Sequence, residues 1–435
     1  MRARPGGESE ADGGAPASGS LAALARRGAW AVADQAVFAG TQFVVTALAA
    51  RWMAAEAFGA FATTYAVFLL AATFHTALLS EPALVVGAAG AAADRPRYLT
   101  VLAWLHLRIS VALVAALALA ALALAALGVT ALAGPLAMLA LSAPAMLLLW
   151  LMRRACLLEA TSRLAVAGGL LYLVVLVGLV AALRVGGRLG AATLVAAHGV
   201  AGLAVGLAMA RALGIRRPAS ASEAERRRVL AEHWAYARWS LPTSALTWVP
   251  ANVPYVVLPI AAGWDASGAL RAVTTVFMPF VLANQALGQM LVPVLARATP
   301  EAAARLSRRT AALLTLVSTA GWLACALGGE AVIAALFGAR YAGQGRLLWI
   351  LGLLPVLNGP TGVMLSHLRA RGRAEAVFWA YLAGAACAVT AGVAATARWL
   401  LDGAALAIIG AYLVLLAATA LQVRRGVGNR SPGPA

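Results

Sequence analysis

The sequence predicts an all-α polytopic membrane protein with about 12 transmembrane helices, arranged as two parallel six-helix pseudo-repeats. The chain has 435 residues, of which 63% are hydrophobic and only 11% are charged. Soluble domains carry about 25% charged residues, so most of this chain belongs in a lipid bilayer. Long apolar runs recur along the sequence, and the arginines gather in alternate loops. No soluble domain of useful size fits in the residues that remain.

Apolar runs long enough to cross a bilayer as helices lie between charged or turn residues. They cover residues 28–50, 58–85, 101–127, 131–152, 164–183, 190–212, 239–262, 269–295, 310–328, 346–368, 376–396 and 403–422. The turn between the third and fourth runs is the least marked, because residues 128–134 hold no charge. A miscount there would invert every later helix, so this turn decides the topology.

The 34 basic residues are all arginine, and they give the chain a formal net charge of +18. Seven of them lie in the loops on one side of the twelve-span arrangement, and the others lie on the opposite side. The seven are Arg51, Arg184, Arg188, Arg271, Arg340, Arg346 and Arg398. Because basic residues accumulate on the cytoplasmic side of membrane proteins, we expect both termini to be cytoplasmic. A nucleic-acid-binding protein would instead gather its arginines on one folded face.

The expected organisation is two lobes joined by a connector. Residues 1–27 are predicted to form a disordered cytoplasmic tail, because Gly, Ala, Ser and acidic residues predominate there. The N-terminal lobe covers residues 28–212, and the C-terminal lobe covers residues 239–422. Residues 213–238 combine a Pro/Ala/Ser linker with a charged interfacial helix, and residues 423–435 form a second tail. We interpret the linker as a solvated connector, with a binding site for acidic phospholipid or a partner as the alternative.

Recurring landmarks indicate an internal repeat. Trp30 and Trp239, and Gly59 and Gly268, are separated by 209 residues; Ala160 and Ala370, and Arg163 and Arg373, are separated by 210. Six spans per half is an even number, so both halves enter the membrane in the same sense. Parallel repeats of this kind are related by a pseudo-twofold axis along the membrane normal, with a pathway between them.

Asp34 lies inside the first span, one or two helical turns from its cytoplasmic end. An ionisable group at that depth needs water or a partner, so Asp34 is the first candidate for function. Arg238, in a similar place in the second half, is a candidate partner. Gln35, Gln42 and Thr46 give the same span a polar side. A structural ion pair and a hydrated carboxylate remain as alternative interpretations.

The eighth span carries a second polar stripe. Arg271, Gln285 and Gln289 are spaced to share one helical face, and Asn284 lies beside them. Such a stripe either lines a pathway, where it binds sugar hydroxyls or phosphate, or joins neighbouring helices. We favour the pathway interpretation.

Prolines interrupt two spans and predict bent or broken helices. The seventh span contains Pro242, Pro250, Pro254 and Pro259, together with Asn252. The tenth contains Pro355, Asn358 and Pro360. Each interior proline removes a backbone hydrogen bond, and freed carbonyls are tolerated in a membrane only against protein or a watery cavity. Both spans are therefore expected to face the pathway and to bend during alternating access, with a merely structural kink as the alternative.

The sequence contains none of the catalytic motifs that we looked for. There is no Walker A motif, nucleophile elbow or H-E-x-x-H motif, and we expect no enzyme activity, no catalytic residue and no cofactor. Cys156, Cys325 and Cys387 lack metal-ligand spacing, so no metal site is expected. The histidines at positions 75, 198 and 367 are isolated along the sequence and show no metal-ligand spacing, so they are interpreted as satisfied hydrogen-bonding residues rather than proton carriers.

Short motifs in both halves carry a family resemblance. The segment ALAARWMAAEAFGAF holds Ala50, Arg51, Glu56, Phe58 and Gly59. It resembles the turn between the first two spans of polysaccharide flippases in the multidrug/oligosaccharidyl-lipid/polysaccharide (MOP) exporter superfamily. In the second half, LFGARYAG and LRARGRAEA are similar to the family pattern and hold Phe337, Gly338, Tyr341, Gly372 and Arg373.

The resemblance implies transport of undecaprenyl-pyrophosphate-linked oligosaccharide, a polysaccharide precursor, across the bacterial cytoplasmic membrane by rocking of two lobes. Arg51 and Arg271 would then attract pyrophosphate, although few arginines fall in the middle of a span. The implied partners are membrane lipid, the lipid-linked glycan and polysaccharide-assembly proteins, but no nucleic acid. The chain is expected to act as a monomer, and coupling to H⁺, Na⁺ or the membrane potential stays open.

Three other interpretations remain. In the multidrug branch of the same superfamily an acidic residue in the first span couples transport to protons or sodium, a role that Asp34 fits. The major facilitator superfamily is matched in part by Gly90, Asp94, Arg95 and Arg97, but the glycine expected beside Arg97 is missing. A scaffold for polysaccharide synthesis would leave the polar first, seventh and eighth spans unexplained.

Overall fold

The computed structural model describes residues 19–84, 95–158, 161–215 and 222–428, which form helices and no strand. The N-terminal half consists of α1 (Gly19–Trp52), α2 (Ala55–His75), the π-helix η1 (Thr76–Ser80), α4 (Arg95–Ala126), α5 (Thr130–Leu158), α6 (Ser162–Val185) and α7 (Ala191–Ala212). The C-terminal half consists of α8 (Glu223–Ala262), α9 (Trp264–Arg297), α10 (Pro300–Phe337), the 3-10 helix η4 (Ala339–Tyr341), α11 (Arg346–Leu351), α12 (Leu353–Ala370), α13 (Ala374–Cys387), the π-helix η5 (Ala388–Gly392) and α14 (Val393–Gly428).

Within the described residues, 11 segments are long and apolar enough to cross a membrane. The last of them, Ala374–Arg425, has 52 residues, which is roughly 78 Å of helix and far more than one crossing needs. Leu400 breaks it with non-helical angles, φ 50° and ψ −123°. The segment therefore crosses twice, which gives twelve crossings and confirms the predicted fold class.

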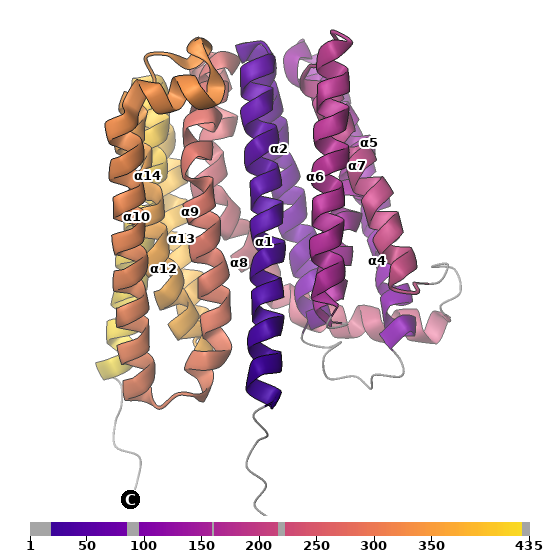
Figure 1. The fold of residues 1–435 in the computed structure, drawn as a ribbon, viewed down its shortest axis with the longest axis vertical. Coiled ribbons are helices and arrows are strands. Elements are labelled where there is room, and N and C mark those ends of the chain that lie inside the picture. The colour runs from indigo at the N-terminus through magenta and orange to yellow at the C-terminus, as the bar shows by residue number, and fades with distance from the viewer. Residues whose placement is uncertain (1–18, 85–94, 159–160, 216–221, 429–435) are drawn as a thin grey trace, which may run out of the picture.

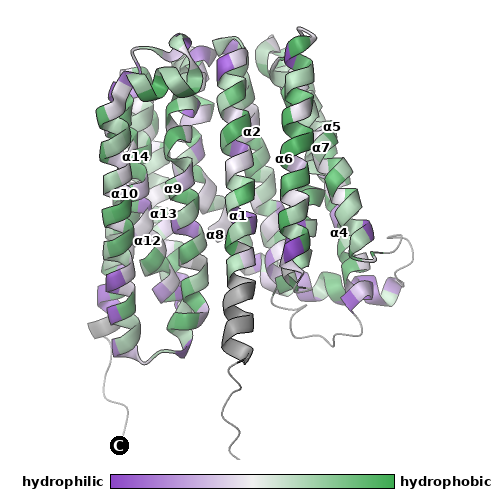
Figure 2. Ribbon diagram, in the orientation of Figure 1, coloured by the Kyte–Doolittle hydropathy of each residue, from purple (hydrophilic) through white to green (hydrophobic). Residues whose placement is uncertain are grey.

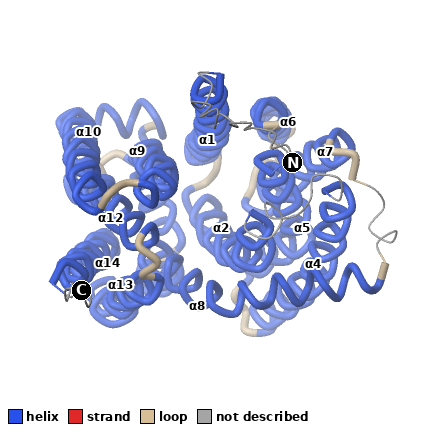
Figure 3. Tube along the Cα trace, turned by 90° about the horizontal axis from the view of Figure 1, so that it is seen from below, coloured by secondary structure: helices blue, strands red, loops and turns tan. Residues whose placement is uncertain are grey.

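The helices form two bundles that stand side by side (Figure 1). Seen from below, α2 and α4–α7 lie in one bundle and α9–α14 in the other, while α8 runs between them (Figure 3). The described ends of α1 and α14 lie at the same end of the molecule (Figure 1). Hydrophobic residues cover the middle of the bundles, and hydrophilic residues gather toward the ends (Figure 2), as a membrane-spanning protein requires.

The turn that decided the topology lies where the sequence predicted it. Helix α4 ends at Ala126 and α5 begins at Thr130. Gly128 between them has a φ of 77°, a conformation that glycine adopts without steric cost. The third and fourth spans are therefore separate helices. This fixes the direction in which each later helix crosses the membrane.

The first and last helices extend beyond their predicted bounds. Helix α1 begins at Gly19, so the expectation that residues 1–27 are entirely disordered is wrong for residues 19–27.

Residues 1–18 of that tail, 216–221 of the connector and 429–435 of the second tail lie outside the described residues. So do Gly90 and Asp94 of the partial major facilitator motif, because residues 85–94 are not described.

The proline-rich spans do not break where they were expected to. Helix α8 continues through Pro242, Pro250, Pro254 and Pro259, and it changes direction after running across the lower end of the N-terminal bundle (Figure 1). In the tenth span the break falls at Gly352, between α11 and α12, and α12 continues through Pro360. Neither span is broken at its prolines, because neighbouring helices hold these segments helical despite the lost hydrogen bonds. The change of direction in α8 agrees with the bent form of the prediction.

Helices α2, α8 and α9 join the two halves. The Thr63 hydroxyl of α2 donates to the carbonyl oxygen of Tyr255 in α8 (2.9 Å), and the Trp248 indole of α8 donates to the carbonyl oxygen of Ala66 in α2 (2.8 Å). At the end where α1 stops and α2 starts, the Arg51 guanidinium donates to the carbonyl oxygen of Ala335 in α10 (3.1 Å). The Arg51 contact joins the halves at the end opposite the chain termini, and the contacts of Thr63 and Ala66 join them further along α2.

Candidate functional site

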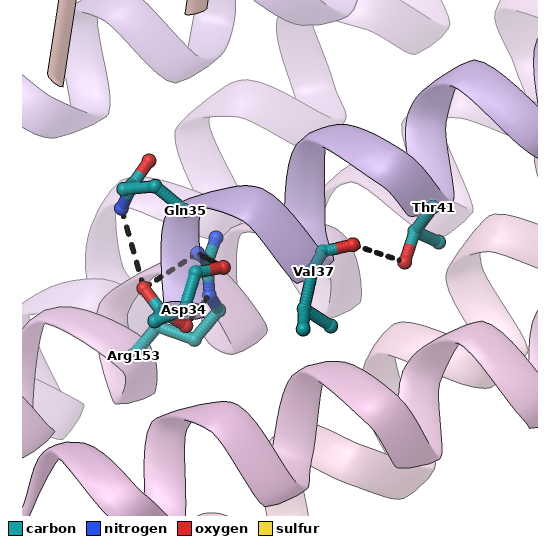
Figure 4. A network of polar contacts seen from close by, with 5 residues as sticks. All are labelled: Asp34, Gln35, Val37, Thr41 and Arg153. Atoms are coloured by element: carbon teal, nitrogen blue, oxygen red, sulfur yellow. Dashed lines mark hydrogen bonds and ion pairs between the residues drawn. The ribbon is translucent and has the colours of Figure 1, made fainter. Parts of the chain in front are cut away.

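Asp34 of α1 is paired with Arg153, near the end of α5 (Figure 4). The Arg153 Nε atom lies 3.0 Å from Oδ1 of Asp34, and Nη2 lies 2.7 Å from Oδ2. Only 2% of Asp34 and 7% of Arg153 are exposed. The Gln35 amide also donates to Asp34 (3.2 Å), and the Arg153 guanidinium lies 3.9 Å from the centre of the Phe38 ring. This is a bidentate buried ion pair with the charge of each partner compensated.

The partner of Asp34 was not foreseen. Sequence reasoning named Arg238, whereas the structure pairs Asp34 with Arg153, 119 residues away. Arg153 follows the apolar run at residues 131–152 and looked like a basic residue at the end of a span. Its pairing ties α1 to α5 within the N-terminal half. A carboxylate held in this way is not available to a cation unless the pair separates.

A second polar cluster surrounds Arg271, which projects from α9 toward the N-terminal half. The guanidinium carbon lies 5.0 Å from the centre of the Tyr65 ring on α2, and the Tyr65 hydroxyl donates to Gln42 Oε1 on α1 (3.0 Å). Beside Tyr65, the Tyr172 hydroxyl of α6 hydrogen-bonds Nδ1 of His198 on α7 (2.8 Å). We call these five residues the Arg271 cluster. It contains side chains from both halves.

Arg271 is a cation without an acidic partner. Among the residues that the structure describes, no carboxylate lies within ion-pair distance of its guanidinium. Its Nε atom is buried and has no hydrogen-bond partner in that part of the chain. Tyr255 and Thr274 lie beside it. Buried donors normally find acceptors, so this arginine retains capacity to bind an anion.

Gln42 and Arg271 are the predicted site residues that the structure brings together. Tyr65 and Tyr172 were missed, whereas His198 is a hydrogen-bonded residue as predicted, although its place in this cluster was not. Single aromatic residues in apolar spans look like packing residues, because sequence does not show which hydroxyls meet a partner on another helix. The polar face of the first span and the polar stripe of the eighth were the signals that pointed to this cluster.

The remaining candidates do not converge on the Arg271 cluster. Asn284 donates to the carbonyl oxygen of Pro355 (2.9 Å) and to the Ser318 hydroxyl (3.3 Å), so it joins α9 to α12 and α10. Asn252 donates to the carbonyl oxygen of Trp248 within its own helix (2.9 Å).

Gln285 is exposed, Gln289 lies further along α9, and Asn358 is half-buried in α12 with an unpartnered Oδ1 among the described atoms. The stripe along the eighth span is therefore divided between a contact with the N-terminal half at Arg271 and packing within the C-terminal half at Asn284.

We searched the described residues for side chains that could bind a metal ion. In the described ranges, no group of three or more His, Cys, Asp or Glu side chains is placed to hold a metal ion. Cys156, Cys325 and Cys387 form no disulfide bond in the described structure. The polar groups of the two clusters can therefore bind ions and hydrogen-bonding groups, but they show no metal-binding arrangement.

No known protein family profile and no curated protein matches the chain. Solved structures do match. The inward-facing conformation of a multidrug resistance MATE family transporter of the MOP superfamily has a TM-score of 0.72 at 14% identity, covering 93% of this chain and 100% of that one. The chain has the MATE fold. The outward-facing conformation of such a transporter gives a TM-score of 0.67 at 15% identity over 93% and 97% of the two chains.

A eukaryotic MATE transporter shares the MATE fold as well, with a TM-score of 0.61 at 14% identity over 94% of this chain and 96% of that one. These matches support the resemblance to the MOP superfamily at the level of fold and do not distinguish the flippase branch. Within this MATE fold, the Asp34–Arg153 pair belongs to the N-terminal half alone, whereas the Arg271 cluster spans both halves.

Proposed function

We propose that the chain is a transporter, not an enzyme, that carries an anionic lipid-linked saccharide across the cytoplasmic membrane of a bacterium by alternating access of its two halves. The cargo class is undecaprenyl-pyrophosphate-linked oligosaccharide. The proposal includes a monomer with both termini in the cytoplasm, and polysaccharide-assembly proteins as its partners.

The observation that carries the proposal is the unpaired guanidinium of Arg271 between the halves. A guanidinium matches the geometry of phosphate oxygens and keeps its charge at any depth in the membrane. The surrounding hydroxyl, amide and imidazole groups are suited to saccharide hydroxyls. When two lobes rock about such a site, the anionic headgroup is exposed first to one side and then to the other.

The placement of Asp34 supports an anionic cargo. A transporter of organic cations benefits from a buried free carboxylate, but Asp34 is neutralised by Arg153 at 2.7 Å. The positive charge of Arg271 then dominates the contact between the halves.

The test is deletion of the gene in its host, followed by measurement of lipid-linked saccharide on the cytoplasmic face and of polymer at the surface. Accumulation inside with loss outside, reversed by the intact gene, is the expected result, and mass spectrometry of the accumulated lipid identifies the saccharide. Unchanged pools in a host without redundant flippases would overturn the proposal.

Cation-coupled multidrug export is the second candidate, because the matched solved structures include multidrug resistance transporters. It requires the Asp34–Arg153 pair to open and release the carboxylate to a proton, Na⁺ or drug. Loss of coupled dye efflux in Asp34→Asn, with surface glycan intact, would favour this candidate over the first.

A further inference from the structure

Two buried histidines meet inside the N-terminal half, apart from both polar clusters. Nε2 of His75 at the end of α2 lies 3.0 Å from Nδ1 of His106 on α4, and the rings are nearly perpendicular at 84°. They are 1% and 3% exposed. His75 is therefore hydrogen-bonded, as predicted, but its partner on the next long helix was not foreseen.

This hydrogen bond has room for one additional proton. In the neutral pair one ring donates its N–H and the other accepts it. A proton added to the distant nitrogen of the donor ring makes an imidazolium, which donates to the same acceptor in a stronger, charge-assisted bond. With a second added proton, both rings would be positively charged, and an N–H group of each would point at the other. This repulsion limits the pair to one added proton.

The surroundings leave that proton without a fixed counter-charge. On α5 the Pro144 backbone faces His106, and on α4 the Arg108 guanidinium lies over Trp104 instead. On α8 the His233 ring is held by Tyr98. Across the described ranges, no ion pair involves either histidine of the pair. Burial without a counter-charge disfavours the added proton, so we expect its uptake to depend on the conformation around the pair.

A buried hydroxyl next to the pair also has no partner. Ser110 lies one turn after His106 on the same face of α4, is 5% exposed, and its Oγ has no hydrogen-bond partner among the described residues. Unsatisfied buried hydroxyls normally bind water. A water on Ser110 would provide a hydrogen-bonded step toward the imidazole pair.

The segment after His75 connects the pair to the other half. The π-helix η1 starts at Thr76, and π-turns are frequent at functional sites. The carbonyl oxygens of Ala77 and Leu78 accept hydrogen bonds from Ser240 Oγ (3.4 Å) and His233 Nδ1 (3.0 Å), both on α8. A change at His75 therefore acts directly on the segment that holds α8, the helix between the two bundles.

We propose that His75 and His106 form a proton-binding site that takes up one proton per transport cycle and couples the proton gradient to movement of α8. The coupling rests on the proposed transport function, whereas proton binding does not. Glutamine reproduces the hydrogen-bonding position of Nε2 and asparagine that of Nδ1. His75→Gln/His106→Asn therefore keeps a polar contact but does not titrate.

The first experiment follows ring ¹⁵N signals of histidine in the full-length protein in nanodiscs, from about pH 8 to about pH 5. We expect the two rings to titrate together with one proton, and the step to vanish in the double variant. His367→Gln in the C-terminal half, whose Nδ1 lies 3.1 Å from Ser307 Oγ, is the control that keeps the step. Two rings that stay neutral in the folded protein would overturn the site.

The second experiment measures uptake of a fluorescent undecaprenyl-pyrophosphate-linked saccharide into proteoliposomes. We expect an imposed pH gradient to stimulate the wild type, and the double variant to retain downhill exchange without stimulation. Equal stimulation of both proteins would overturn the coupling. A wild type that binds the proton but moves no saccharide would refute the proposed function and leave the proton site standing.

Discussion

Gly59 and Gly268 lie against each other where α2 and α9 cross. A Cβ on Gly59 would lie 1.6 Å from the carbonyl oxygen of Trp264, and a Cβ on Gly268 would lie 3.0 Å from that of Ala55. Ala55 and Trp264 are separated by 209 residues, as Gly59 and Gly268 are. The contact is therefore reciprocal, as expected where two repeats related by a pseudo-twofold axis meet.

Gly59→Ala is expected to destabilise the protein by about 1–3 kcal/mol, because the new methyl group meets backbone rather than a flexible side chain. Thermal unfolding of the purified protein in detergent measures the effect. Gly40→Ala in α1 is the matched control, since no atom lies within 4 Å of its Cβ position. It should unfold at the wild-type temperature or slightly above it. Equal unfolding of the two variants would show that the crossing is looser than described.

Asp34→Asn should cost about 3–5 kcal/mol of stability, because it leaves the buried Arg153 charge without its partner. Arg153→Gln should cost a similar amount, and the double variant less than the sum. The control is the exposed pair of Arg346 and Asp402, 3.1 Å apart, where Asp402→Asn should cost less than about 1 kcal/mol. Additive effects at Asp34 and Arg153 in this unfolding cycle would argue against a direct interaction.

Arg271→Gln should reduce surface glycan roughly tenfold or more at normal protein levels, since a charge-assisted hydrogen bond to phosphate is lost. Arg271→Lys keeps the charge and should retain part of the activity. Gln285→Ala, at an exposed position of the same helix, should have no effect. Quantification of surface polymer in the deletion host provides the measurement. Wild-type display in Arg271→Gln would remove the Arg271 cluster from the pathway.

His233 should make stability depend on pH. It lies before the span that starts at Ser240, and burial lowers the pKa of its imidazole below the ordinary value of 6.5, an effect that the hydrogen bond to Leu78 opposes in part. Between the lowered pKa and 6.5 the unfolded chain binds the proton and the folded chain does not. Stability is therefore lost as the pH falls below 6.5.

His233→Gln removes that contribution. Unfolding temperatures measured across this pH range should fall less steeply in the variant than in the wild type. Parallel curves would show that His233 does not titrate on unfolding.

Leu400→Gly should raise stability by about 1 kcal/mol, because leucine at φ 50° is strained and glycine is not. Leu406→Gly is the control, because that leucine is similarly exposed in the regular part of α14. It should lower stability by about 1 kcal/mol through reduced helix propensity. A lower unfolding temperature for Leu400→Gly would mean that its side chain contributes more to packing than its backbone costs.

The sequence by itself determined the membrane class, the order of the spans and the even number of crossings. Hydropathy is a local property that is summed over about 20 residues, so the spans can be located from the sequence. The turn between the third and fourth spans carries no charge, but Gly128 still marks its position. The place of Asp34 within a span was predictable for the same reason, because its neighbours along the helix are apolar, whereas its burial was not. The repeat was also visible, since Gly59 and Gly268 keep one offset.

Only the tertiary structure decided which side chains meet. Asp34 and Arg153 are 119 residues apart, and His75 and His106 are 31 apart. Their contacts depend on which helices pack together and on how each helix is rotated. The continuity of α8 through its prolines was decided in the same way, because neighbouring helices compensate for the lost hydrogen bonds. Long-range packing selects partners among residues that look equivalent along the chain, and no local pattern contains that information.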